Sequence, residues 1–471
     1  MFEAIKAAIE GRNRQKQIYI DARGGTGKTF LLNRLLHYVR TLDDDAIAIS
    51  VAFTGIAAQL LQGGRTFNSR FKFPLNQDAT ATCNISKQSG LSRLIQKAKV
   101  NVWDEAAMSH KFLLEGLDRT LQDLMDSKET FGGKVIVLAG DFRQLPTVIP
   151  KASRAQIVAA SFKKSYLWPS FKIMRLEENM RIQNNGNDPK LIEFDHWLEQ
   201  LGNGRLESVE EEDSFVTLPE QLRVKIDEKE QQKSMNDAIN FTFGDITTKS
   251  AMPEWMEFVS SRAILATTND FVNNINQICL DRLPGDEVII PSADSTVDLD
   301  DATHYPVEYI NSLQISGMPP HRLNLKKGAV LMLLRNLNIR GGLCNGTRLL
   351  IQEIINDRLI KATIANGEGK GRTVLIPKIQ TRPADYNQFG FEWQRLQFPV
   401  RLAFAMTIHK SQGQTLNGVA VWLQEPCFGH GQLYVAALRV GNPDNIKFFV
   451  RSKEGHPDFT TRNVVYPELL Q

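Results

Sequence analysis

The sequence predicts an α/β protein with parallel sheets covered by helices, and with a small β-barrel inserted into a second α/β domain. Residues 1–150 alternate short apolar strands with amphipathic helices, which is the pattern of a parallel sheet buried on both faces. Residues 320–380 change to closely spaced strand-like runs divided by Gly- and Asn-rich turns, as in a small barrel. At 471 residues the chain is too long for one ordinary core, so roughly three domains are expected.

The first domain is expected to hold four strands and a well-marked helix. The helix spans residues 29–40 and places five apolar residues on one face, namely Leu31, Leu32, Leu35, Leu36 and Val39. The strands are expected at 17–21, 46–53, 99–106 and 134–142. A polar segment follows each strand, and ligands of parallel sheets bind beyond the carboxyl ends of the strands. A binding site is therefore expected at that edge of the sheet.

The rest of the chain returns to the α/β pattern on both sides of the predicted barrel. Residues 205–260 are polar, and their acidic run ESVEEED at 207–213 is expected to be a solvated loop or the start of a helix. The segment RAILATTNDFVNNIN at 262–276 predicts a strand followed by a helix, and residues 402–423 resume this pattern after the barrel.

The distribution of charge carries more information than its total. Lys and Arg number 56 against 53 Asp and Glu, and the net charge of +3 neither announces nor excludes a polyanionic partner. Residues 142–175 contain seven Lys and Arg and no acid, and residues 309–352 contain six and again no acid. Each run alone is as typical of a solvated face, but together they would suit a groove for a phosphate backbone.

The cysteines and the N-terminus bear on the cellular compartment. Cys83, Cys279, Cys344 and Cys427 are far apart and form no C-x-x-C pair, which argues against a disulfide framework and a zinc site and is typical of core residues in a reducing compartment. Residues 1–17 lack the apolar core of a signal peptide, and no apolar run approaches the roughly 18 residues of a membrane span. An intracellular, soluble protein is expected, in the nucleus if the organism is a eukaryote.

The stretch DARGGTGKT, residues 21–29, is close to the phosphate-binding pattern G-x-x-x-x-G-K-[ST]. Its glycines allow successive backbone N–H groups to converge on phosphate oxygens. Lys28 would supply a charge for the β- and γ-phosphates of ATP, and Thr29 a hydroxyl for Mg²⁺ at the start of a helix. Ala22 replaces the first glycine, which costs nothing if its backbone is extended and on the order of 1–2 kcal/mol if φ is positive. The expected phosphate-binding residues are Ala22, Gly24, Gly25, Thr26, Gly27, Lys28 and Thr29.

A nucleotide hydrolase also needs a carboxylate near the magnesium ion and a base for the attacking water. Of the three Asp-Glu pairs in the chain, only the pair at 104–105 directly ends an apolar strand. Asp104 is therefore expected at the metal, and Glu105 is expected to act as the base. Gln144, in LAGDFRQLP after the next strand, is placed to sense the γ-phosphate and to pass its state to another domain. The alternative for Gln144 is a polar loop residue without such a role.

Taken in order, these motifs resemble the superfamily-one PIF-type (petite integration frequency) DNA helicases, most closely the helicase module of Helitron-type mobile elements. The resemblance runs from about residue 17 to residue 450. It rests on the segments GGTGKT, AFTGIAAQLLQGGRTFNS, DEAAM, FGGKVIVLAGDFRQLP, SYLWPSFKIMRLEENMR, LATTNDFVNNIN, LLRNLNIRGGLCNGTRLLI, FPVRLAFAMTIHKSQGQTL and HGQLYVAALRV.

The resemblance implies two RecA-like lobes with ATP between them, a small β-barrel inserted in the second lobe and single-stranded DNA across the top. The implied boundaries are 1–175 for the first lobe, 176–310 and 395–471 for the second, and 311–394 for the barrel. It also implies ATP-driven movement along single-stranded or forked DNA from 5′ to 3′, Mg²⁺ as cofactor and a monomeric motor. Roles in DNA repair, recombination and telomere maintenance belong to relatives in this family.

The family motifs also imply roles for individual residues. LEENMR makes Arg181 an arginine finger and YVAALRV makes Arg439 another, both from the second lobe, so that they reach the phosphate only when the lobes close. The implied catalytic residues are Lys28, Glu105, Gln144, Arg181 and Arg439, with Thr29 and Asp104 at the metal. The implied DNA contacts are Thr54, Asn68, Ser69, His409, Lys410 and Ser411, which grip the strand without a sequence code.

Three features depart from the family pattern. Ala22 replaces a glycine, and Ala437 and Leu438 replace the Leu and Ser that usually precede the last arginine. The glutamine motif that reads adenine is expected upstream of the first helix, yet the sequence begins at Met1 with FEAIKAAI. These departures leave open a degenerate, mobile-element-derived protein that binds nucleotide or DNA without productive unwinding. A nucleic-acid-stimulated ATPase acting on RNA is a further alternative, and no His-x-His pair predicts an associated nuclease.

Overall fold

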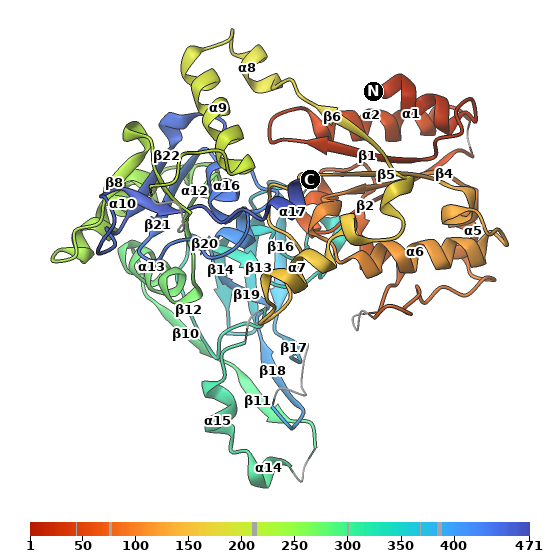
Figure 1. The fold of residues 1–471 in the computed structure, drawn as a ribbon. Helices are drawn as coiled ribbons and strands as arrows, with labels where there is room; N and C mark the ends of the chain where they lie inside the picture. The colour runs from red at the N-terminus through yellow and green to blue at the C-terminus, as the bar shows by residue number, and fades with distance from the viewer. Residues whose placement is uncertain are drawn as a thin grey trace.

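The computed structural model describes residues 1–43, 45–74, 78–209, 214–298, 301–315, 317–367, 369–383 and 389–471. Residues 210–213 of the acidic run lie outside the described residues, so the loop or helix start expected there is described only up to residue 209. The described chain forms two parallel sheets with helices around them, and an antiparallel arm that projects away from both (Figure 1).

The first sheet is built from the apolar strands of residues 1–176, which we call the first lobe. Its order is β3-β2-β4-β5-β1-β6, and all of its pairs are parallel. The strands are β1 (Gln17–Ala22), β2 (Ile47–Ala52), β3 (Arg65–Thr66), β4 (Ala98–Asp104), β5 (Val135–Gly140) and β6 (Lys172–Leu176). The four expected strands are β1, β2, β4 and β5. The two edge strands had no apolar run to reveal them, because β3 has two residues and β6 is largely exposed.

Helices cover both faces of this sheet, as Figure 1 shows. Leu32, Leu35 and Leu36 are fully buried against one face, where they form a core with Ile5. Leu113 and Leu117 belong to a separate core on the other face. The helices of the first lobe are α1 (Phe2–Ile9), α2 (Lys28–Arg40), α3 (Gly55–Gln59), α4 (Phe67–Phe71), α5 (Gly90–Lys97), α6 (Lys111–Leu124) and α7 (Arg154–Ala160).

The second parallel sheet has the order β20-β9-β21-β22-β8, and we call the part of the chain built on it the second lobe. Its strands are β8 (Arg223–Lys225), β9 (Arg262–Ala266), β20 (Ala405–Thr407), β21 (Gly418–Leu423) and β22 (Ile446–Val450). Its helices are α8 (Met180–Asn184), α9 (Pro189–Asn203), α10 (Gln231–Phe243), α11 (Ile246–Lys249), α12 (Trp255–Ser260), α13 (Asn269–Arg282) and α16 (Gln432–Ala437). The α/β prediction with two parallel sheets is confirmed.

The strand-rich region forms an antiparallel sheet in the order β16-β15-β14-β13-β19. Its strands are β13 (Val330–Leu333), β14 (Arg348–Ile355), β15 (Leu359–Ile364), β16 (Thr373–Pro377) and β19 (Val400–Leu402). Among the described residues no pairing joins the edge strands β16 and β19, so this sheet is open and the predicted small barrel is not confirmed. Leu331, Leu349 and Ile360 lie on the buried face of this sheet and belong to the core of the second lobe. The second lobe therefore buries the apolar face that a barrel would enclose within itself.

The arm projects from this sheet toward the bottom of Figure 1. It contains β10 (Val288–Pro291), β11 (Ala293–Thr296), β12 (Arg322–Leu325), β17 (Ile379–Thr381), β18 (Trp393–Gln397), α14 (Asp301–His304) and α15 (Val307–Ser312). Ile310, Met318, Phe391 and Trp393 form a small core within it. Since β10 begins at residue 288, the arm starts before the expected boundary at residue 310, and the domain boundaries stay predictions.

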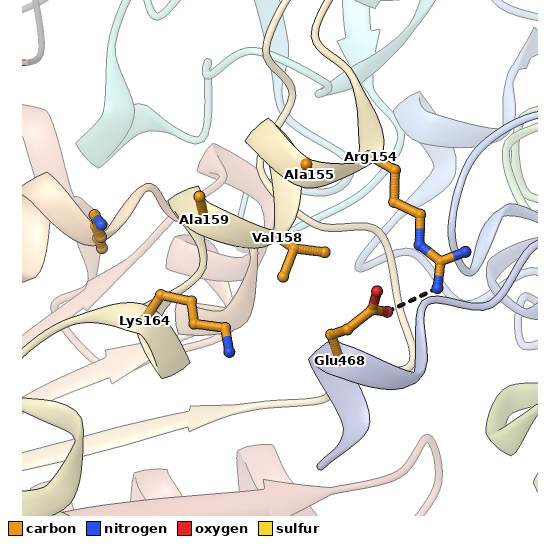
Figure 2. Close-up of a pocket in the computed structure, with 7 residues that line it drawn as sticks. Arg154, Ala155, Val158, Ala159, Lys164 and Glu468 are labelled. Atoms are coloured by element: carbon orange, nitrogen blue, oxygen red, sulfur yellow. Dashed lines mark hydrogen bonds and ion pairs between the residues drawn. The ribbon is translucent and has the colours of Figure 1, made fainter.

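The end of the chain crosses from the second lobe to the first. β23 (Thr460–Arg462) pairs with β7 (Phe215–Thr217), and α17 (Pro467–Leu470) then lies against α7 (Figure 2). Arg154 of α7 forms a 2.8 Å ion pair with Glu468, and Leu469 is buried. Residues 460–470 therefore connect the two lobes, and we call them the C-terminal strap.

All four cysteines are buried as free thiols, which agrees with the prediction that they are core residues. Among the helices of the described residues, none has the length and apolar content needed to cross a lipid bilayer.

Candidate functional site

The phosphate-binding loop lies between the end of β1 and the start of α2. Ala22 is the last residue of β1 and pairs with Leu176, so its backbone is extended and an alanine carries no strain there. Gly25 and Gly27 have φ values of 87° and 82°, a conformation that residues with a side chain rarely adopt. Because α2 begins at Lys28, the free N–H groups of its first turn adjoin this loop. The loop is thus compatible with phosphate binding despite Ala22.

The second lobe covers this loop closely. A Cβ atom on Gly24 would lie 2.8 Å from Cδ2 of Leu438, and one on Gly25 would lie 2.7 Å from Oδ1 of Asn179. The backbone N–H of Met180 donates a 3.1 Å hydrogen bond to the carbonyl of Gly25. Leu438 is one of the two residues before Arg439 that depart from the family pattern, so this departure acts directly on the phosphate-binding loop.

Lys28 is held between two acids at the end of β4. Its Nζ lies 2.8 Å from Oδ1 of Asp104 and 2.6 Å from Oε1 of Glu105. Burial alone would lower the pKa of Lys28, but the two carboxylates outweigh it and raise that pKa. Burial raises the pKa of Glu105, and the charge of Lys28 only partly opposes this. Lys28 therefore stays charged, and the Glu105 carboxylate is more basic than an exposed one.

Glu105 adopts an unusual backbone conformation. Its φ of 52° and ψ of 35° lie in the left-handed region, which costs a non-glycine residue roughly 1–2 kcal/mol. Its N–H donates a 2.8 Å hydrogen bond to Oδ1 of Asp104, the same oxygen that contacts Lys28. Strain of this kind persists only where the surrounding structure enforces it, and it is often found at functional sites.

The residues near this cluster have the chemistry expected of a magnesium site. Thr29 stands in the first turn of α2, next to Lys28. A threonine hydroxyl and the Asp104 carboxylate are hard oxygen donors, the type that Mg²⁺ prefers, and Mg²⁺ usually keeps several water ligands as well. The donor set fits the ion, although Oδ1 of Asp104 is engaged by Lys28 in this conformation.

The two predicted arginine fingers have different surroundings. Arg439 is buried and donates to three backbone carbonyls, those of Val435 at 2.7 Å, Gln414 at 2.8 Å and Ser411 at 2.9 Å. Burial lowers the pKa of Arg439 to about 10. Arg181 lies over the phosphate-binding loop, with its Cδ 3.2 Å from the Cβ position of Gly25. In the part of the chain that the structure describes, its guanidinium has no hydrogen-bond or ion-pair partner.

Gln144 connects the segment after β5 to the second lobe. Its Oε1 accepts a 3.1 Å hydrogen bond from Nε2 of Gln412, and both side chains are buried. Gln412 also lines the groove described next. Sequence reasoning missed Gln412, although the two glutamines of SQGQ, directly after the predicted DNA contacts, were a usable signal.

A groove of about 1040 Å³ lies between the two lobes. Its volume lies at the top of the roughly 300–1,000 Å³ range of small-molecule pockets. Five of the six predicted DNA contacts line it, namely Thr54, Asn68, Ser69, His409 and Lys410. Phe53 and Val148 add partly exposed apolar surface on which bases can rest. Burial lowers the pKa of His409 and the pKa of Lys410.

Ser411 does not line this groove. It is fully buried, and its Oγ donates a 2.7 Å hydrogen bond to the carbonyl of Ile408. Its own carbonyl accepts a hydrogen bond from Arg439. Because its side chain is buried, Ser411 is poorly placed for the predicted contact with DNA. Its contacts indicate a structural role, in which its carbonyl holds Arg439.

Sequence reasoning also missed polar contacts that hold the lobes together around the phosphate-binding loop. Arg23, within the loop, forms a 3.1 Å ion pair with Glu199 of α9. The hydroxyl of Tyr434 donates a 3.1 Å hydrogen bond to Oδ2 of Asp141, which follows β5. Neither pair is adjacent in sequence, so no local motif could have revealed them.

Comparison with known proteins assigns this architecture. A family model described as PIF1-like helicase matches residues 1–212, and one described as the 2B domain of DNA helicase Pif1 matches residues 308–354. Together the two ranges take in more than half of the chain. The chain belongs to the PIF1-like helicase family. Its two parallel-sheet lobes are the RecA-like lobes of such helicases.

Individual relatives are similar over nearly the whole chain. The ATP-dependent DNA helicase Pif1 of Psychrobacter sp. (strain PRwf-1) is 27% identical over 92% of this chain, which spans 65% of that protein's length. The ATP-dependent DNA helicase Pif1 of Campylobacter jejuni is 26% identical over 96% of this chain, which spans 92% of that protein.

Solved structures show the same fold. The Pif1 helicase from Bacteroides in complex with ADP-AlF3 and single-stranded DNA has a TM-score of 0.66 at 22% identity, covering 100% of this chain and 94% of that one. The Pif1 helicase from Candida albicans has a TM-score of 0.62 at 23% identity, covering 95% and 96%.

Proposed function

We propose that the chain is an ATP-dependent DNA helicase that moves along single-stranded DNA, with the 5′-to-3′ polarity typical of its family. One observation carries the proposal. The same two lobes enclose the phosphate-binding loop and the groove, and Gln144 joins the two through its hydrogen bond to Gln412. The names of the relatives, as ATP-dependent DNA helicases, support it.

ATP binding is proposed to begin with an exchange of partners at Lys28. Asp104 and Glu105 neutralise its ammonium in the structure, and the more negative phosphates would draw it toward the loop glycines. Glu105 then loses the cation that opposes the effect of burial, so its pKa rises further and it becomes a better acceptor for the proton of the attacking water. Lys28 is thus the proposed phosphate clamp, and Glu105 the proposed general base.

Thr29 and Asp104 are the proposed residues for Mg²⁺. The ion, when bound, neutralises charge on the β- and γ-phosphates. Movement of Lys28 toward the phosphates would free Oδ1 of Asp104 for this role. The same movement therefore links nucleotide binding to completion of the site.

Arg181 is the proposed finger nearest the phosphates, because its side chain contacts the loop at Gly25 and its guanidinium has no partner among the described residues. Arg439 is proposed to act indirectly, through its charge and its hydrogen bonds, and not by direct contact with the phosphates. Its charge lies within electrostatic reach of Glu105 and lowers the pKa of that carboxyl, while its hydrogen bonds hold the segment that lines the groove. Since both arginines belong to the second lobe, their effect depends on how the lobes are placed.

The groove is proposed to hold single-stranded DNA. Asn68 and Lys410 would contact phosphates from opposite lobes, and Phe53 would contact bases. Contacts of this type bind single-stranded DNA without recognising its sequence. A monomeric state, a reducing intracellular compartment, and roles in DNA repair, recombination and telomere maintenance are further proposals. The likeness to Helitron-type modules stays a prediction.

The deciding experiment measures ATP hydrolysis in Mg²⁺ with and without single-stranded DNA, for the wild type, Lys28→Ala and Glu105→Gln. We expect strong stimulation by DNA, no turnover in Lys28→Ala, and ATP binding with severely slowed turnover in Glu105→Gln. Forked substrates with a 5′ or a 3′ single-stranded tail then test polarity, and RNA as competitor tests substrate class. DNA binding without turnover in the wild type would favour the degenerate alternative, and equal turnover in Lys28→Ala would refute the site.

A further inference from the structure

A second cavity, of about 810 Å³, lies at the base of the arm. One wall is α13, another is formed by residues 311–315 and 317–324, and β18 and β19 complete it. Seven of its lining residues carry side-chain amides, among them Asn269, Asn273, Asn311 and Gln314. Amides can both donate and accept hydrogen bonds, which is what the edge of an unpaired base requires.

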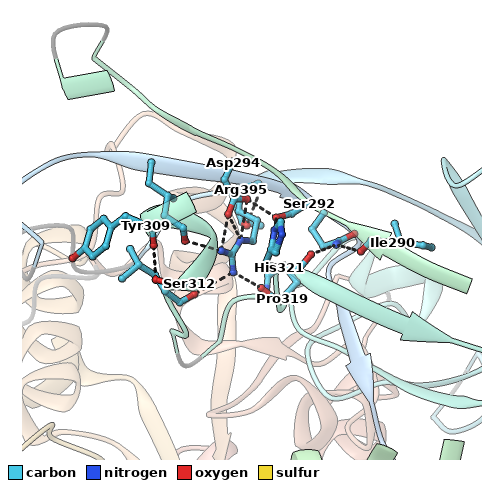
Figure 3. A network of polar contacts seen from close by, with 12 residues as sticks. Ile290, Ser292, Asp294, Tyr309, Ser312, Pro319, His321 and Arg395 are labelled. Atoms are coloured by element: carbon cyan, nitrogen blue, oxygen red, sulfur yellow. Dashed lines mark hydrogen bonds and ion pairs between the residues drawn. The ribbon is translucent and has the colours of Figure 1, made fainter. Parts of the chain in front are cut away.

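Hydrogen bonds and an ion pair hold Arg395 in the wall on the arm side. Arg395 lines the cavity but is fully engaged, as Figure 3 shows. It forms a 2.7 Å ion pair with the buried carboxylate of Asp294 and donates to the carbonyls of Ile310 and Pro319 at 3.1 and 3.0 Å. Its charge is therefore already compensated, and Arg395 shapes the cavity without being available to a ligand.

Arg401 also lines this cavity but, unlike Arg395, forms no ion pair with a described residue. Its guanidinium donates only to neutral amide oxygens, those of Asn269 at 3.3 Å and Asn273 at 3.0 Å. Asp270 also lines the cavity but is exposed and forms no ion pair with Arg401. Within the described residues, Arg401 has no carboxylate partner, and burial lowers its pKa. A partly buried cation without a counter-charge is a place where an anion gains binding energy.

Arg401 lines the cavity and Lys410 lines the groove, and the two residues are nine positions apart in the chain. Arg401 lies in β19, and the chain leads through β20 to Lys410, which lines the groove. The two cations are close enough that Arg401 adds to the effect of burial in lowering the pKa of Lys410. Among the described residues, the Lys410 ammonium has no ion-pair partner either. A single phosphate near both would relieve their mutual repulsion.

One amide of the cavity, that of Asn311, has a buried oxygen that lacks a hydrogen-bond donor among the described residues. Oδ1 of Asn311 is shielded from solvent and accepts no hydrogen bond from the described residues. A buried acceptor without a donor is unfavourable. The exocyclic amine of an unpaired base is a donor of suitable size, whereas the paired bases of a duplex would present no free Watson–Crick edge.

We propose that this cavity is a nucleotide subsite that extends the single-stranded DNA path beyond the groove. In it, Arg401 and Lys410 bind one backbone phosphate, and Asn311 and Gln314 face the edge of the adjoining base. This inference rests on the proposed binding of single-stranded DNA by the groove. It makes Arg401 a DNA-binding residue, and it allows a modest base preference that the groove alone would not give.

The first test compares Arg401→Gln with Arg358→Gln by fluorescence anisotropy on a labelled oligonucleotide, over a series of salt concentrations. Arg358 lies in the exposed turn between β14 and β15, lines neither the groove nor the cavity, and is the matched control. We expect Arg401→Gln to weaken binding and to reduce the salt slope by about one, because one phosphate contact is lost. An unchanged slope would overturn the proposal.

A second test does not depend on α13, which Arg401 also contacts. The four native cysteines are buried, so a single exposed cysteine can be labelled with a maleimide-linked benzophenone. Gln314→Cys should crosslink to single-stranded DNA on illumination, and Glu308→Cys on α15, which does not line the cavity, should not. Lys72→Cys in the groove is the positive control. Crosslinking at 72 but not at 314 refutes the subsite alone, and crosslinking at neither refutes the proposed function.

Discussion

Gln412 of the second lobe donates a 3.1 Å hydrogen bond to Gln144 of the first, and the two buried side chains lie where the segment that follows β5 meets the groove. Gln144 is held in turn by Asp141, whose Oδ2 accepts from it at 3.4 Å. A hydrogen bond between neutral amides is lost when its atoms separate by about 1 Å. Its formation therefore depends on the relative position of the lobes, which is what both ligands are expected to change.

We expect Gln412→Leu to weaken the coupling between DNA and ATP hydrolysis. A net contribution of about 1 kcal/mol for one hydrogen bond corresponds to a loss of about fivefold in DNA-stimulated turnover. Unstimulated turnover should change little, because Gln412 makes no other side-chain hydrogen bond among the described residues. Steady-state ATPase assays over a DNA titration measure both quantities.

The control for this prediction is the double variant. If Gln144→Leu and Gln412→Leu act through the same contact, the double variant should lose no more stimulation than either single variant. Additive losses would show that the two glutamines act independently.

The close contact of Leu438 with the phosphate-binding loop gives a second prediction. Gly24→Ala should reduce ATP affinity and turnover, because its new methyl group would lie 2.8 Å from Cδ2 of Leu438 and force the loop or the leucine to move. Adding Leu438→Ala should restore part of the lost affinity by removing that atom. Nucleotide titrations monitored by a fluorescent ATP analogue test this. If the double variant binds no better than Gly24→Ala, the defect comes from the loop itself.

The different surroundings of the two arginines predict different defects. Arg181→Ala should lower turnover with little effect on thermal stability, since its guanidinium has no partner among the described residues. Arg439→Ala should lower turnover and also destabilise the protein by several kcal/mol, because the buried carbonyls of Val435 and Gln414 lose the Arg439 donor at about 1–3 kcal/mol each. The Ser411 carbonyl loses one of its two donors and keeps the backbone N–H of Gln414. Turnover assays and thermal unfolding of the same preparations separate the two. Equal stability of both variants would contradict this account of Arg439.

Local sequence patterns predicted the first lobe because its central strands are continuous apolar runs. They also placed Lys28, Asp104 and Glu105 near one another, since consecutive parallel strands end at the same edge of a sheet, and in the structure Lys28 contacts both acids. Local patterns could not predict whether the strands of residues 320–380 form a barrel or an open sheet. The sheet they form is covered by the core of the second lobe, and this cover is a tertiary contact that no strand pattern records.

The motif TIHKSQG shows what sequence patterns cannot predict for single residues. The segment Ile408–Ser411 forms a short 3₁₀ turn, in which neighbouring side chains point in different directions. As a result His409, Lys410 and Gln412 line the groove, while Ser411 turns inward to the carbonyl of Ile408. The sequence indicates that the motif is functional, but only the backbone of the turn decides which of its residues faces the ligand.

His430 gives a prediction on pH, because it links the C-terminal strap to the first lobe. Its Nε2 donates to the carbonyl of Phe142 and its Nδ1 accepts from the backbone N–H of Tyr466, both at 2.8 Å, so the ring is neutral. Burial lowers its pKa below the ordinary 6.5, opposed by the Phe142 carbonyl, by Asp141 and by the more distant Glu468. Arg154 acts in the same direction as burial.

The sign follows from proton binding. Below about pH 6.5 the unfolded chain takes up a proton at His430 while the folded state resists it, so stability is lost as the pH falls from about 6.5 toward the lower folded pKa. Each unit of difference in pKa is worth about 1.4 kcal/mol. His430→Gln can keep a donor and an acceptor but cannot titrate, so its unfolding midpoint should fall less than that of the wild type between about pH 8 and about pH 5. Other buried histidines are common to both proteins and cancel in the difference. Parallel pH profiles would mean that His430 titrates normally and that its link to the strap is not maintained in solution.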